Sequence, residues 1–96
     1  MTRRAHKIDV NQPAIVKALR KEGFSVAITS ALGSGFPDIV AGKDGRNYLL
    51  EIKNGNGGLT DDEKEFSGAW QGQYAIVRNV EEAYAACGVP DWRPPF

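Results

Sequence analysis

Three charged side chains in the middle of the chain have the types and spacing that hydrolysis of a phosphodiester needs. Asp38 begins one strand-like segment, and Glu51 and Lys53 end the next one. Residues two apart in a strand point to the same side, about 7 Å apart, and a hairpin can bring the first segment alongside. Two converging carboxylates make an oxygen site that suits Mg²⁺. The lysine could then orient or deprotonate the attacking water, or hold a phosphate oxygen as a point charge.

The acid-x-Lys pattern alone is weak evidence, because Asp62-Glu63-Lys64 matches it too and Pro90-Asp91 repeats the Pro-Asp at 37–38. The first of these decoys lies on an expected helix, where residues two apart diverge around the axis. The second follows every acid-x-Lys in the chain. The remaining alternative for the trio is an amphipathic strand with a solvated salt bridge. The order of the segments favours the catalytic interpretation.

The elements around these residues follow from local signals. Pro13 in a first turn and Gly23 at a stop bound a helix, for which Asn11 is expected to be the N-cap. Asp44-Gly45 between two strand-like runs predicts a hairpin, and Thr60 with Glu63 forms a capping box. We therefore predict helices over about 12–22, 61–70 and 80–87, and strands over 24–29, 37–41, 47–53 and 73–77.

Hydrophobic periodicity predicts which residues face the core. Alternation in the first strand points Phe24, Val26 and Ile28 inward, and in the third strand Tyr48, Leu50 and Ile52. Phe66 and Trp70, four apart, are expected to pack the second predicted helix on the sheet.

Composition limits the chain to one domain with a single core, which we place at 11–96 after a flexible basic arm at 1–10. The net charge is zero, but six of the eight charged residues in positions 1–22 are basic. Cys87 is the single cysteine and is expected to be a buried, structural residue in an intracellular protein. No signal peptide or membrane span is apparent, so we expect a cytoplasmic protein without a membrane partner.

A family resemblance follows from the order of the motifs. Pro37-Asp38 and then Glu51-Ile52-Lys53, preceded by a helix and followed by a helix and a strand, resemble the PD-(D/E)xK nuclease superfamily. More narrowly, segments 11–20, 37–42, 48–53, 59–60 and 75–78 resemble small stand-alone VRR-NUC domains of phage type and archaeal Holliday-junction resolvases. The resemblance extends over about residues 9–86.

The resemblance implies an α/β fold with a restriction-endonuclease-like αβββαβ core and a mixed sheet flanked by helices. It implies a DNA nuclease that uses Mg²⁺ or Mn²⁺, with Asp38 and Glu51 as metal ligands, Lys53 as the catalytic lysine and the carbonyl of Ile52 as a further ligand. Many members carry a glutamate on the first helix where this chain has Gln12, whose amide could act indirectly through a metal-bound water.

These inferences together favour a structure-selective or nonspecific DNA endonuclease, with branched DNA such as Holliday junctions as the expected substrate, of phage origin and acting as a twofold homodimer. One active site per chain makes two copies necessary to cut both strands of a junction symmetrically. The DNA contacts expected are Arg3, Arg4, Lys7, Lys17, Ser30 and Ser34, and the dimer contacts Trp70, Trp92 and Phe96. The alternative is a nucleic-acid-binding module of the same fold with weak or no catalysis, which Gln12 and the zero net charge favour.

Overall fold

Four strands form one mixed sheet in the order β1-β2-β3-β4 in a computed structural model that describes residues 11–89. Strand β2 (Ile39–Lys43) is antiparallel to both of its neighbours, β1 (Ser25–Ile28) and β3 (Arg46–Ile52), and β4 (Ala75–Val77) runs parallel to β3. The arm at 1–10 and the segment at 90–96, with Trp92, Phe96 and the Pro90-Asp91 decoy, lie outside the described residues.

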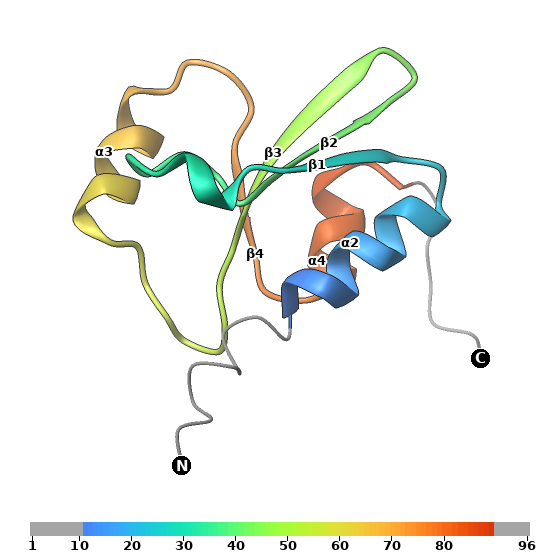
Figure 1. Ribbon diagram of the computed structural model, residues 1–96, viewed down its shortest axis with the longest axis horizontal. Helices are drawn as coiled ribbons and strands as arrows, with labels where there is room; N and C mark the ends of the chain where they lie inside the picture. The colour runs from blue at the N-terminus through green and yellow to red at the C-terminus, as the bar shows by residue number, and fades with distance from the viewer. Residues whose placement is uncertain (1–10, 90–96) are drawn as a thin grey trace.

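Within residues 11–89, three α-helices flank the sheet. Helices α2 (Asn11–Lys21) and α4 (Val80–Ala86) lie together, and α3 (Asp61–Ala69) lies apart from them beyond the strands (Figure 1). The core forms between α2, α4 and the sheet, and its fully buried side chains include Ile15, Leu19, Ile39, Leu50 and Val77. This mixed sheet with three flanking helices confirms the predicted α/β, restriction-endonuclease-like architecture.

The hairpin between β2 and β3 sets the register in which these two strands pair. Lys43 pairs with Arg46, which leaves Asp44 and Gly45 as a two-residue turn with φ values of 54° and 80°. Positive φ at both positions is the type I′ geometry that Asp-Gly favours, so the sequence prediction is confirmed. The same register pairs Ile39 with Leu50 at the other end of the ladder.

The boundaries of the elements differ from the predictions by at most two residues. Asp38 precedes β2 instead of lying within it, although its carbonyl still accepts the backbone N–H of Thr29 at 2.8 Å. A short 3₁₀ helix, η1 (Ser30–Leu32), interrupts the loop after β1.

The burial predictions hold for most positions and are wrong for two. Ile28 is 56% exposed instead of buried, because it ends the edge strand β1 and has no strand on its outer side. Trp70 is 42% exposed and stacks on Phe66 with ring centroids 5.2 Å apart, so the predicted pair forms without burying the indole. Cys87 is buried as expected.

Candidate active site

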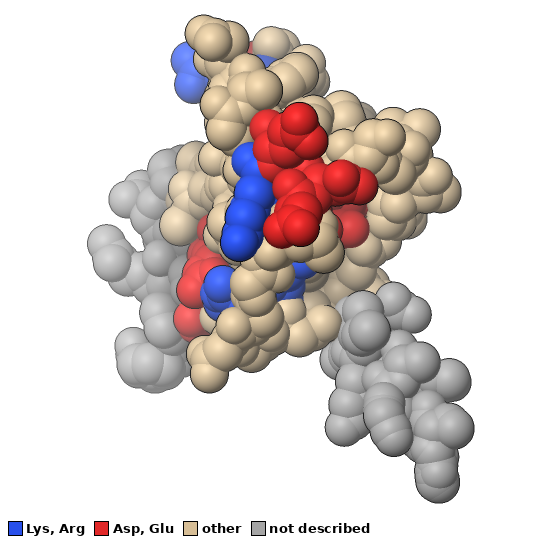
Figure 2. All heavy atoms as spheres, turned by 90° about the vertical axis from the view of Figure 1, so that its left-hand side faces the viewer, with Lys and Arg blue, Asp and Glu red and all other residues tan. Residues whose placement is uncertain are grey.

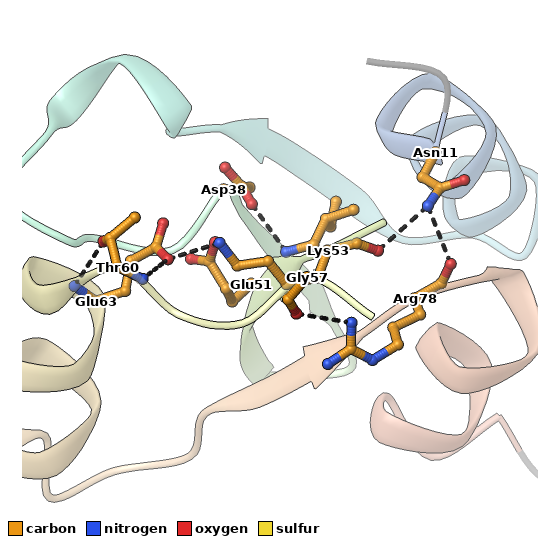
Figure 3. A network of polar contacts seen from close by, with 9 residues as sticks. Asn11, Asp38, Glu51, Lys53, Gly57, Thr60, Glu63 and Arg78 are labelled. Atoms are coloured by element: carbon orange, nitrogen blue, oxygen red, sulfur yellow. Dashed lines mark hydrogen bonds and ion pairs between the residues drawn. The ribbon is translucent and has the colours of Figure 1, made fainter. Parts of the chain in front are cut away.

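Asp38 and Glu51 meet where β2 and β3 leave the hairpin ladder. Continuing the pairing of Ile39 with Leu50 by one residue sets Asp38 opposite Glu51, and opposite residues of an antiparallel pair share a face. The backbone N–H of Ile52 donates to Asp38 Oδ2 at 2.8 Å, which fixes the aspartate against the end of β3 (Figure 3). The structure therefore brings together the two acids that the sequence paired.

Glu51 is buried although the sequence placed it on the polar face of its strand. It is 2% exposed, and its Oε1 atom has no hydrogen-bond partner among the described residues. Burial, followed by the charges of Asp38 and Glu63 and a hydrogen bond to Asp38, raises its pKa from 4.5 to about 8, although the charge of Lys53 opposes the shift. A buried carboxylate without enough positive charge around it is costly to ionise.

Lys53 bridges Glu51 to a residue on α3. Its Nζ lies 2.6 Å from Glu63 Oε1 and 3.6 Å from Glu51 Oε2. Burial by itself lowers the pKa of Lys53, but the hydrogen bond and charge of Glu63 and the charge of Glu51 raise it above 10.5 in balance. Lys53 is thus a protonated ammonium in this arrangement, which favours a role as a point charge over that of a general base.

Glu63 is a site residue that the sequence reasoning missed. It belongs to the capping box that the sequence predicted, in which Glu63 Oε1 accepts the backbone N–H of Thr60 at 2.9 Å and the glutamate N–H donates to Thr60 Oγ1 at 3.2 Å. Burial raises the pKa of Glu63, but the hydrogen bonds from Lys53 and Thr60 outweigh it and lower that pKa. The same carboxylate therefore starts α3 and holds the lysine.

Tyr74 also belongs to the neighbourhood of the carboxylates. Its hydroxyl is buried without a hydrogen-bond partner in the part of the chain that the structure describes. Burial and the negative charges of Glu51, Glu63 and Asp38 raise its pKa to about 12. An aromatic residue before a short strand is ordinarily a core residue, so the sequence carried no signal for this placement.

Hydrogen bonds from the first residue of α2 and from the residue after β4 hold the ends of the site. The amide nitrogen of Asn11 donates to the carbonyls of Lys53 at 3.2 Å and Arg78 at 3.1 Å, so it joins the first helix to the site instead of capping that helix as predicted. Arg78 Nη1 donates to the carbonyl of Gly57 at 3.1 Å (Figure 3) and to that of Gly55 at 2.8 Å, which anchors the loop after the lysine.

The remaining predicted site residues are dispersed. Gln12 is half-buried at the start of α2 and makes no hydrogen bond to Asp38 or Glu51. Lys17 is exposed on α2, and Ser30 and Ser34 are exposed in the loop between β1 and β2. Arg3, Arg4 and Lys7 fall outside the described residues.

The chemistry of the donor set fits a divalent ion. Within residues 11–89, no three His, Cys, Asp or Glu side chains gather in a way that could hold a metal. Two carboxylates are available, and one buried oxygen of Glu51 lacks a partner. Mg²⁺ is commonly bound by one or two carboxylates and keeps several waters, so the pair Asp38 and Glu51 is sufficient for it.

Charge is unevenly distributed over the surface. Acidic side chains gather on the face that carries α3, whose first turn holds Asp61, Asp62 and Glu63 (Figure 2). Helix α2 has the opposite character, with no acid in its first turn and Arg20 and Lys21 in its last. Phosphates are repelled by the first surface and attracted by the second.

The sheet order, together with two carboxylates and a lysine at the ends of neighbouring strands, is that of a PD-(D/E)xK nuclease. Residues 9–60 match the family model described as archaeal Holliday junction resolvase (hjc). The chain belongs to this family, and the family implies a nuclease with a DNA substrate. No curated protein and no solved structure matched the chain.

The matched segment contains Asp38, Glu51 and Lys53 and ends before Glu63 and Tyr74. The placement of Glu63 and Tyr74 beside the carboxylates is therefore known from the structure alone. No helix within residues 11–89 is long and apolar enough to cross a membrane.

Proposed function

We propose that the protein is a divalent-metal-dependent endodeoxyribonuclease that hydrolyses phosphodiester bonds in branched DNA such as Holliday junctions. The observation that carries the metal dependence is the buried Oε1 of Glu51, which has no partner among residues 11–89 and faces the charge of Asp38. A buried carboxylate that is costly to ionise beside a second carboxylate is stabilised in its charged form by a cation.

The chain's own residues have distinct roles in this proposal. Asp38 and Glu51 would hold Mg²⁺ or Mn²⁺, with the carbonyl of Ile52 as a further ligand and Gln12 reaching the ion only through water. The bound ion would supply positive charge for activating a water and for neutralising the phosphate. Lys53, kept protonated by Glu63, would hold a phosphate oxygen or orient the attacking water as a point charge.

A cleavage assay tests the proposal. Purified protein is incubated with a four-way junction and with linear duplex, in Mg²⁺, in Mn²⁺ and in chelator. We expect metal-dependent cleavage with preference for the junction, and a loss of at least about 100-fold in Lys53→Ala. Lys64→Ala is the matched control, because Lys64 is exposed on α3 within the decoy motif. This variant should cleave DNA like wild type.

Two results would refute the proposal. DNA binding without cleavage in either metal, with Lys53→Ala equal to wild type, would identify a binding module of the same fold. Equal cleavage in chelator would exclude the metal role of Asp38 and Glu51. The twofold homodimer is a separate part of the proposal, which light scattering after size exclusion tests by the mass of the particle in solution.

A further inference from the structure

A groove runs between α2 and the free edge of β1, outside the active site. It has a volume of about 410 Å³ and is lined by Gln12, Pro13, Val16, Lys17, Arg20 and Ile28. Its apolar wall includes Ile28, a large aliphatic side chain that is 56% exposed. Such a side chain in a concave surface is a place where a ligand can bury apolar area.

The chemistry of the groove combines an apolar wall with positive charge. Lys17 is exposed and makes no hydrogen bond or ion pair to any described residue. Arg20 donates from one terminal nitrogen to the carbonyl of Val26 at 3.1 Å, which places its guanidinium across the edge of β1. The amide of Gln12 adds a donor and an acceptor. Aliphatic side chains can contact a base, cations can contact a phosphate and an amide can bond to a base edge, so this combination suits a nucleotide.

The backbone links both sides of the groove to segments of the active site, although Ile28 shares a sheet face with Ile39 and not with Asp38. Ile28 pairs with Ile39, the residue directly after Asp38. Gln12 directly follows Asn11, whose side chain donates to the carbonyl of Lys53 at 3.2 Å. A DNA strand whose phosphate reaches Asp38 and Lys53 would therefore pass the start of α2, where Gln12 lines one end of the groove.

We propose that this groove, lined by Ile28, Lys17 and Gln12, binds one unpaired nucleotide of the DNA next to the bond that is cut. The volume lies at the lower end of the range for small-molecule sites, about 300–1,000 Å³, and suits one base with its sugar. A base stacked in an intact duplex cannot enter a recess in the protein, whereas an unstacked base at a branch can. The groove would thus select branched DNA, and in this respect the inference rests on the proposed nuclease function.

Binding without metal tests the apolar wall of the groove separately from cleavage. Fluorescence anisotropy in chelator compares a duplex carrying one unpaired thymidine with the same duplex fully paired. We expect wild type to prefer the first DNA by about 5-fold or more, and Ile28→Ser to lose most of that preference. Ile76→Ser is the matched control, because Ile76 is 39% exposed on β4 and lies outside the groove.

The rim is tested by two lysines on the same helix. Lys17→Gln should lower the slope of log affinity against log salt by about one, as expected for one lost phosphate contact. Lys21→Gln removes the same charge from the exposed end of α2, outside the groove, and should change that slope much less. Far-UV circular dichroism checks that each variant is folded.

Three outcomes of the DNA-binding assays would overturn the proposal: no preference in wild type, an equal loss in Ile28→Ser and Ile76→Ser, or identical slopes for the two lysine variants. Loss of self-association in Ile28→Ser with an unchanged DNA preference would assign the groove to a second copy of the chain and would also overturn it. If wild type fails to cleave but the groove variants lose the preference, the groove stands and the nuclease function fails. If wild type cleaves and the groove variants bind DNA like wild type, the nuclease function stands and the groove proposal fails.

Discussion

Replacing Glu51 by glutamine should stabilise the metal-free protein at alkaline pH, although it removes a proposed metal ligand. The pKa of Glu51 lies at 4.5 when unfolded and about 8 when folded, so folding at intermediate pH requires proton uptake. The folded state binds this proton more tightly, and the stability associated with Glu51 is therefore present below pH 4.5 and lost as the pH rises to about 8. An amide keeps the shape of the side chain and has no charge to bury.

The magnitude follows from the two pKa values. The difference between 4.5 and about 8, at about 1.36 kcal/mol per pH unit, corresponds to at most about 5 kcal/mol at pH 8 or above. Water entry into a site next to an exposed loop reduces this, and we expect about 2–5 kcal/mol. For a domain of this size, the smaller figure raises the melting temperature by at least about 8 °C.

The assay is thermal or urea unfolding in chelator from pH 5 to pH 9, for wild type and Glu51→Gln. The variant should gain stability over wild type as the pH rises, and added Mg²⁺ should stabilise wild type alone. Glu65→Gln, at an exposed position of α3, is the control and should change stability by less than about 0.5 kcal/mol. If Glu51→Gln is less stable than wild type at pH 8, the buried carboxylate of Glu51 does not destabilise the folded protein at that pH, and the reasoning is refuted.

Two further variants test how the site is held. Gly35→Ala should cost about 1–3 kcal/mol more than Gly33→Ala in urea unfolding: both glycines have positive φ, but a Cβ at Gly35 would collide with the backbone of α3 whereas one at Gly33 meets nothing. Equal losses would mean that the loop yields without strain. Glu63→Gln should retain the helix cap while lowering the pKa of Lys53, seen as an altered pH profile of cleavage; Thr60→Ala should cost about 1 kcal/mol of stability and leave that profile unchanged. Identical pH profiles for wild type, Glu63→Gln and Thr60→Ala would mean that Glu63 does not control the pKa of Lys53 during cleavage.

Much of the fold was predictable because its signals are local. The Asp44-Gly45 turn determines the hairpin, and Thr60 with Glu63 determines where α3 begins, since each depends on a few neighbouring residues. Strand alternation identified Phe24 and Leu50 as core residues. It was wrong for Ile28, because alternation shows which side a residue faces and not whether another element covers that side.

The candidate site divides in the same way. Asp38, Glu51 and Lys53 could be paired from sequence because strand period and hairpin register bring them together. Glu63 and Tyr74 could not, since they reach the carboxylates only when α3 and the segment before β4 fold against the strands. Asn11 was expected to cap its own helix, but its amide bonds to two carbonyls that are distant in sequence.

The sequence by itself determined which residues could do chemistry and on which neighbouring strands they stand, because residue type, strand period and turn type are properties of short segments. Only the tertiary structure decided the electrostatic state of these residues. It buries Glu51 without a partner for one oxygen among residues 11–89, holds Lys53 protonated against Glu63, and opens a basic groove beside α2. The physical reason is that desolvation and charge pairing depend on every element that packs around a group.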